Sequence, residues 1–139
     1  MFKRLLILAL FPAFANAATL YEFPILRVID GDTIAFEYKQ LPDPLKPELH
    51  LRVWGVDTPE KNFLAKCDAE KQKGIAASEF TKKLVENAKK IQIEIKDWDK
   101  YGGRVLGNIY LDGQNLRGIL IQQGYAKEYY GGTKESWCK

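Results

Sequence analysis

The stretch ILRVIDGDTIAFEY, residues 25–38, sets the fold of this chain. Its first five residues are mostly aliphatic and predict a strand over 25–29. Asp30-Gly31-Asp32 is a turn signal, and residues 33–38 alternate as a second strand does. The stretch therefore predicts two strands joined by a turn with two carboxylates.

The residues that follow predict three more strands and two helices. Three prolines in residues 40–48 exclude a central strand and indicate an exposed loop. Apolar residues near every third or fourth position predict an amphipathic helix over 68–90. The remaining predicted elements are strands over 49–54, 91–95 and 105–111, and a helix capped by Asn115 that runs through Gln123.

The order of these elements indicates a fold class. Three strands, a helix and two strands form the layout of a five-stranded OB barrel. We therefore expect an α+β, mainly β fold: a five-stranded OB-fold barrel with packed helices. Other small α+β folds share this order, and 139 residues suit one domain.

The first 17 residues have the three parts of a secretory signal peptide. They are a basic start, an apolar run over 5–14, and small residues at positions 15 and 17. A membrane anchor is the alternative, but this run is shorter than the ~20 residues that span a bilayer. We predict cleavage after Ala17, a mature domain over 18–139 without a membrane anchor, and a secreted or periplasmic location.

The net charge does not identify a nucleic-acid binder. The chain has 21 basic and 18 acidic residues, formally +3. Loss of Lys3 and Arg4 with the signal peptide leaves 19 basic residues, a formal charge of +1. Any phosphate binding must then come from local clusters of charge.

Two cysteines, Cys67 and Cys138, are candidates for a disulfide. An exported protein meets an oxidising compartment in which such a pair tends to bridge. Two free thiols, or a bond to another chain, are the alternatives.

Carboxylates stand at the ends of the predicted strands. Asp32 lies in the first turn, and Asp57 and Glu60 lie in the turn after the third strand. Such hard oxygen ligands suit Ca²⁺ or Mg²⁺. Each motif alone is more often structural, because Asp-Gly-Asp is a common turn and Asp-Thr-Pro-Glu a common helix start.

Two arginines accompany these carboxylates. Arg52 is five residues before Asp57, and Arg104 begins the last predicted strand. An arginine fork matches two phosphate oxygens at once. Together with a metal ion and a general base, two arginines would supply the parts that phosphodiester cleavage needs.

Four motifs resemble the staphylococcal (micrococcal) nuclease family. They are IDGDT (29–33), VDTPE (56–60), EFTKKLVENAKKI (79–91) and DKYG (99–102), in the family's order, and the likeness runs from about Ile25 to about Lys127. The resemblance implies an OB fold and one catalytic Ca²⁺. It also implies hydrolysis of DNA and RNA at the 5′-oxygen–phosphorus bond, with 3′-phosphate products.

The resemblance also implies roles for single residues. Asp32 and Asp57 would bind calcium through their side chains, and Thr58 through its backbone carbonyl. Glu60 would position or deprotonate the attacking water, while Arg52 and Arg104 would hold the phosphate and stabilise the transition state. Lys100, Tyr101 and Tyr130 would line the nucleotide pocket. Gly103 is inserted relative to the usual spacing, so Arg104 is matched by counting back from Tyr110.

Two other classes of function remain open. A catalytically inactive OB-fold module that binds nucleic acid or protein is the main alternative, and an exported structural domain is another. The full set of Asp32, Arg52, Asp57, Glu60 and Arg104 favours the enzyme. We expect a monomer, and the sequence leaves the preferred nucleic acid and the physiological purpose open.

Overall fold

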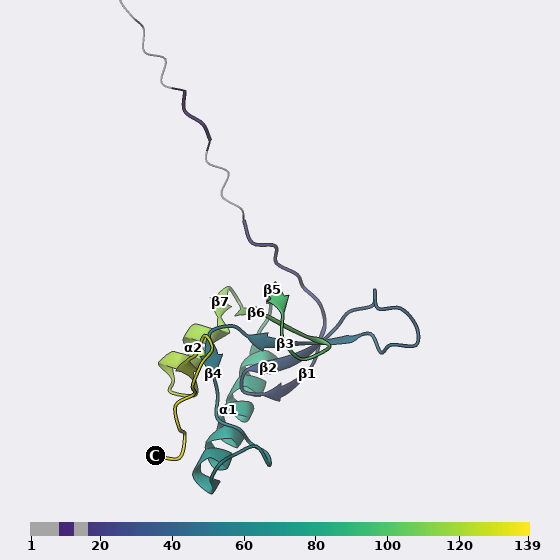
Figure 1. The fold of residues 1–139 in the computed structure, drawn as a ribbon. Helices are drawn as coiled ribbons and strands as arrows, with labels where there is room; N and C mark the ends of the chain where they lie inside the picture. Colours follow the sequence, from purple (N-terminus) through teal and green to yellow (C-terminus); the bar gives the residue numbers. More distant parts are fainter. Residues whose placement is uncertain (1–8, 13–16) are drawn as a thin grey trace, which may run out of the picture.

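A computed structural model describes residues 9–12 and 17–139 of the chain (Figure 1). The predicted signal peptide therefore lies mostly outside the described residues. Within the described ranges, no helix has the length and apolar character required to cross a membrane.

One sheet organises the structure, with the strand order β1-β2-β3-β6-β5. Neighbours in this order pair antiparallel, except β3 and β6, which run parallel. The short strand β7 pairs with β6. The bounds are β1 Ile25–Asp30, β2 Thr33–Glu37, β3 Glu48–Val53, β5 Ile91–Trp98, β6 Arg104–Leu111 and β7 Gln114–Asn115.

Two helices and a second, two-stranded sheet complete the fold. Helix α1 spans Asp68–Asn87 and packs against β1, while α2 spans Leu116–Gln122 and packs against β6. Strand β4 (Val56–Asp57) pairs with β8 (Lys127–Glu128), and the chain then returns beside α1 (Figure 1). The structure confirms a mixed α+β fold built mainly from strands.

The core lies between the sheet and the two helices. Alternate residues of β3 are buried, as expected for a strand with one covered face, whereas four successive residues of β2 are buried. Fully buried side chains include Phe36, Leu51, Ile93 and Leu120. Tyr21 forms a bridge with Ile93, which links the segment before β1 to the far edge strand β5.

Some boundaries differ from the predictions. Helix α1 ends at Asn87 rather than Lys90, because the Asp112 carboxylate accepts hydrogen bonds from the backbone N–H groups of Lys89 and Lys90. Strand β5 continues to Trp98 rather than ending at residue 95, since it resumes pairing with β6 after a bulge. Strands β4, β7 and β8 were not predicted, because each has only two residues, which is too short to show an alternating pattern.

Candidate active site

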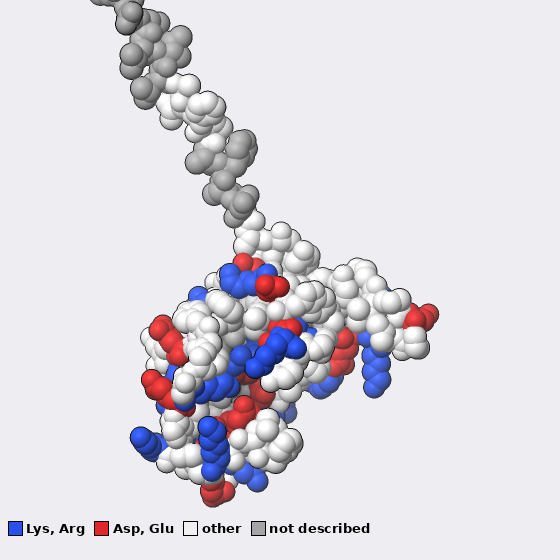
Figure 2. Space-filling view, in the orientation of Figure 1, with Lys and Arg blue, Asp and Glu red and all other residues white. Residues whose placement is uncertain are grey.

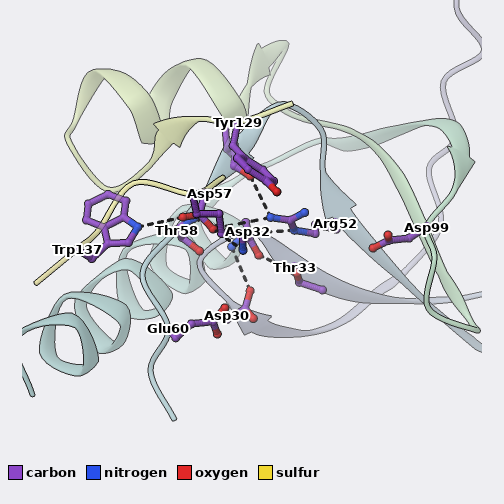
Figure 3. Close-up of polar contacts among 12 residues, drawn as sticks. Asp30, Asp32, Thr33, Arg52, Asp57, Thr58, Glu60, Asp99, Tyr129 and Trp137 are labelled. Carbon is purple, nitrogen blue, oxygen red and sulfur yellow. Dashed lines mark hydrogen bonds and ion pairs between the residues drawn. The ribbon is translucent and has the colours of Figure 1, made fainter. Parts of the chain in front are cut away.

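The turn between β1 and β2 and the end of β3 meet at one point. Thr33 on β2 pairs with Arg52 on β3, so Asp32 lies next to Arg52 (Figure 3). Strand β4 follows β3 after a turn at Gly55 and brings Asp57 to the same place. Antiparallel register and one tight turn therefore gather residues that are 25 positions apart in sequence.

Arg52 contacts both buried aspartates. Its Nε lies 3.7 Å from Asp32 Oδ2 and its Nη2 lies 3.9 Å from Asp57 Oδ1. Nη2 also donates to the backbone carbonyl of Val56 at 3.2 Å. Both carboxylates are more than nine-tenths buried, which strengthens their interaction with one cation.

Asp32 is fixed by its neighbours. The Thr33 hydroxyl donates to Oδ1 at 2.8 Å, and the Thr58 N–H donates to Oδ2 at 3.4 Å. Burial opposes its ionisation, yet hydrogen bonding from Asp30 and the charge of Arg52 hold the pKa of Asp32 below its usual value. Conversely, burial and the charge of Asp32 raise the pKa of Asp30 to about 8. Sequence reasoning assigned Asp30 only to the turn.

Asp57 is held from the C-terminal tail, which sequence reasoning did not connect with the site. The Trp137 indole N–H donates to Asp57 Oδ2 at 3.1 Å, and Lys134 Nζ lies 2.9 Å from Asp57 Oδ1. No local pattern signals these contacts, because 80 residues separate Trp137 from Asp57.

Glu60 stands at the rim of the same site on the loop before α1. Its backbone N–H donates to the buried Glu70 carboxylate at 3.2 Å. Its side chain is half-buried, and burial together with the charge of Asp32 raises the pKa of Glu60. A carboxylate with a raised pKa is a suitable general base or acid.

The polar residues of the site line a groove of about 390 Å³. Its lining includes Asp30, Asp32, Arg52, Glu60, Lys100, Tyr101, Arg104 and Tyr129. Arg104 faces the groove because its position on β6 pairs with His50, which shares a face of β3 with Arg52. Its guanidinium bonds Asp99 through Nε and lies over the Tyr101 ring, 4.5 Å from the ring centre.

The structure defines two features that the sequence left open: the conformation of the inserted Gly103 and the tyrosine that lines the groove. The inserted Gly103 adopts a positive φ of 75° and ends the turn before β6, so the insertion leaves Arg104 at the start of the strand. Tyr129, rather than Tyr130, lines the groove. The Tyr130 ring instead packs edge-on against the Trp54 ring, with the ring centres 5.6 Å apart.

The other predicted residues meet as a group. Asp32, Arg52, Thr58, Glu60, Lys100, Tyr101 and Arg104 line the groove, and Asp57 contacts Arg52 at its edge. Cys67 and Cys138 are bonded in the structure, with Cα atoms 6.0 Å apart.

The donor groups at this point are few and anionic. The described residues contain no cluster of three or more His, Cys, Asp or Glu side chains that could hold a metal by themselves. Two buried aspartates supply hard oxygen donors, and the Thr58 backbone contacts one of them, Asp32, through its N–H. Lys134 Nζ already lies against one of them, so the site accepts a positive charge. A cation with water in its remaining positions fits this donor set.

Charge on the molecular surface seen in Figure 2 is mixed. Figure 2 shows basic and acidic side chains interspersed over the surface rather than one broad basic face. Recognition of an anion therefore depends on the basic residues that line the groove, Arg52, Lys100, Arg104 and Lys134.

Comparison with known proteins gives a consistent picture. Residues 50–137 match the family model described as "Staphylococcal nuclease homologue". The chain is 33% identical over 125 residues to "Endonuclease YhcR" of Bacillus subtilis (strain 168), covering 86% of this chain and 10% of that protein. It is 34% identical over 122 residues to "Endonuclease YncB" of the same organism, covering 86% of this chain and 53% of that protein.

A relative from another genus shows the same level of similarity. "Thermonuclease" of Staphylococcus hyicus is 34% identical over 107 residues, covering 76% of this chain and 57% of that protein. The chain thus spans between 10% and 57% of the length of these curated relatives.

Proposed function

The chain belongs to the staphylococcal nuclease family, and on that premise we propose that it is a calcium-dependent endonuclease acting on DNA and RNA. One observation carries the proposal: two buried aspartates, Asp32 and Asp57, converge on Arg52 at the edge of a groove that also holds Glu60 and Arg104. The names of the relatives support a nuclease.

Asp32 and Asp57 are the side chains that would hold one Ca²⁺, with the Thr58 carbonyl as a third protein ligand. Their burial and carboxylate chemistry fit a hard cation that keeps several water ligands. When bound, calcium would supply positive charge that stabilises the negative charge developing on the phosphate.

Each of the remaining polar residues has its own role in the reaction. Arg52 and Arg104 contact the scissile phosphate and stabilise its transition state through paired N–H donors. Glu60 accepts the proton of the attacking water. Attack of the water oxygen forms a bond to phosphorus and breaks the 5′-oxygen–phosphorus bond. This leaves a 3′-phosphate and a 5′-oxygen that takes a proton from solvent water to become a free hydroxyl.

Lys100 and Tyr101 bind the nucleotide beside Arg104. A basic side chain and an aromatic ring are the usual means of holding a strand without reading its sequence. Tyr129 rather than Tyr130 joins them in this role, because Tyr129 lines the same groove.

We also propose that the sheet is a five-stranded OB-fold barrel and that the protein is exported. The order β1-β2-β3-β6-β5, the parallel β3–β6 pair and the bridge between Tyr21 and Ile93 support the barrel. The composition of residues 1–17 and the Cys67–Cys138 bond support export to an oxidising compartment.

A cleavage assay tests the proposal. Purified protein should degrade single-stranded DNA in the presence of Ca²⁺, stop when a chelator is added, and leave 3′-phosphate ends. E60Q should remove most of the turnover while the protein still binds DNA. Equal cleavage in chelator would refute the metal's role, and DNA binding without cleavage would favour an inactive OB-fold module.

A further inference from the structure

The C-terminal tail, residues 131–139, is fastened over Asp57. The Cys67–Cys138 bond ties its end to the start of α1, and Lys73 on α1 donates to the Trp137 carbonyl at 3.1 Å. From β8, Lys127 lies over the Trp137 ring, 4.4 Å from its centre. These contacts hold Trp137 from both sides of the tail, so the indole is fixed relative to Asp57.

The tail makes two different contacts with the Asp57 carboxylate. Trp137 offers a neutral N–H to Oδ2, at 3.1 Å. Lys134 offers a full positive charge to Oδ1, at 2.9 Å. The neutral donor on Oδ2 fixes the carboxylate and leaves Oδ1 available, since Arg52 Nη2 is 3.9 Å away and beyond hydrogen-bond distance. The Lys134 ammonium group on Oδ1 takes the position of a cation.

We propose that Trp137 is a positioning residue for Asp57, and that Lys134 is a resident counter-ion that a divalent cation displaces. The inference rests on the proposed function, in which Asp57 holds calcium. Lys134 is held less firmly than Trp137: 41% of its side chain is exposed, and beyond Asp57 it contacts the Tyr129 ring at 5.3 Å. Trp137 is held by Lys73, Lys127 and the disulfide.

The two side chains therefore act on calcium affinity with opposite signs. The W137F variant keeps an aromatic ring but loses the N–H, and loss of such an outer hydrogen bond lowers metal affinity by about 10-fold or more. The K134M variant removes a competing charge, and a partly exposed pair of this kind corresponds to a gain of about two- to fivefold. If the tail only covered the fold, the two variants would not change calcium affinity in opposite directions.

Isothermal titration calorimetry with Ca²⁺ alone measures both effects on the full chain. W98F is the control for W137F, because it changes an exposed tryptophan outside the site in the same way. K83M is the control for K134M, because it removes the same charge from an exposed position on α1. Circular dichroism and thermal melting of each variant establish that it is folded.

The expected result is a weaker calcium Kd for W137F, a tighter one for K134M, and wild-type values for both controls. Unchanged affinity in both tail variants, or weakening in both, would overturn the inference. Cleavage of DNA by the wild type is scored separately. If the wild type cleaves DNA but the tail variants keep the wild-type calcium Kd, only the role of the tail is rejected. If the wild type does not cleave DNA but the two variants shift the calcium Kd in opposite directions, only the proposed nuclease activity is rejected.

Discussion

The backbone N–H of Glu60 donates to Glu70 Oε2 at 3.2 Å, which ties the loop of the candidate base to the first turn of α1. The other oxygen of Glu70 accepts the backbone N–H of Lys66 at 2.9 Å. Glu70 is buried, and both of its carboxylate oxygens are used by this one loop. The position of Glu60 is thus set by a residue that does not line the groove.

We expect E70Q to lower turnover by about 10-fold while the protein remains folded. The new amide group would face a backbone N–H donor, and a buried N–H without an acceptor costs about 1–3 kcal/mol. Turnover and urea denaturation measure the two effects. E86Q, an exposed change on α1, should alter neither. Full turnover in a destabilised E70Q would show that Glu70 serves the fold alone.

Close packing of α1 against the Glu60 loop requires glycine at position 74. A Cβ there would lie 2.4 Å from the Glu60 carbonyl oxygen, so G74A must displace this loop. We expect a loss of roughly 1–3 kcal/mol of unfolding free energy and a further loss of activity.

Gly118 on α2 provides the matched control for G74A. A Cβ at position 118 would meet no atom within 4 Å, so G118A should stabilise the protein by about 0.5–1 kcal/mol through helix propensity. Urea denaturation of the two variants measures the contrast. Equal effects of the two changes would exclude the packing argument.

Arg52 should be essential for turnover because it contacts both aspartates and faces the groove. We expect R52A to lose on the order of 10²-fold in turnover, as for removal of one oxyanion donor. R52K should also be strongly impaired, because an ammonium group cannot form the two-pronged contact. R27A, which removes a surface arginine, should keep full turnover. An unchanged rate in R52A would reject the assignment.

An ion pair between β1 and β3 should give the stability a dependence on acid pH. A hydrogen bond from Arg27 and a smaller contribution from a hydrogen bond to His50 lower the pKa of Glu48 from 4.5 to about 2. A lowered carboxyl pKa stabilises the folded state above the unfolded pKa, and this contribution is lost as the pH falls from about 4.5 toward about 2.

We therefore expect E48Q to have a lower melting temperature than wild type at pH 7, with the difference shrinking as the pH falls to about 2. The effect should be small, because the Arg27 side chain is 54% exposed. Thermal melting across this pH range measures it. E79Q, an exposed change on α1, should match wild type throughout. A difference that persists at the acid end would contradict the linkage.

Local patterns predicted the five longer strands of the sheet and the residues on them. The alternation in residues 33–38 and 91–95 was sufficient to find β2 and β5, although four successive residues of β2 are buried and its two faces are therefore both covered. Asp32, Arg52 and Asp57 stood in recognisable motifs, and strand register then brought them together.

The rest of the site depends on contacts between distant segments. Trp137 and Lys134 belong to a tail with no period, and only the folded chain places them on Asp57. Tyr129 and Tyr130 follow β8 directly, and sequence did not reveal the β4–β8 pairing that brings this segment beside the groove.

The disulfide should be a main source of stability. It joins residues 71 positions apart. Closing a loop of that size lowers the conformational entropy of the unfolded chain, which stabilises the folded state by about 4 kcal/mol. Cys67 Sγ also accepts the Glu70 N–H at 3.3 Å as the N-cap of α1. Serine can keep this cap, so the C67S/C138S variant separates loop closure from capping.

We expect the unfolding free energy of C67S/C138S, measured in urea, to fall by about 4 kcal/mol, and that of wild type to fall similarly when it is reduced. Intact mass before and after reduction establishes the bond in the purified protein. Two alkylatable thiols in the native protein, or a variant as stable as wild type, would contradict the prediction. Because the same bond anchors Trp137, its loss should also weaken calcium binding under conditions in which the variant is fully folded.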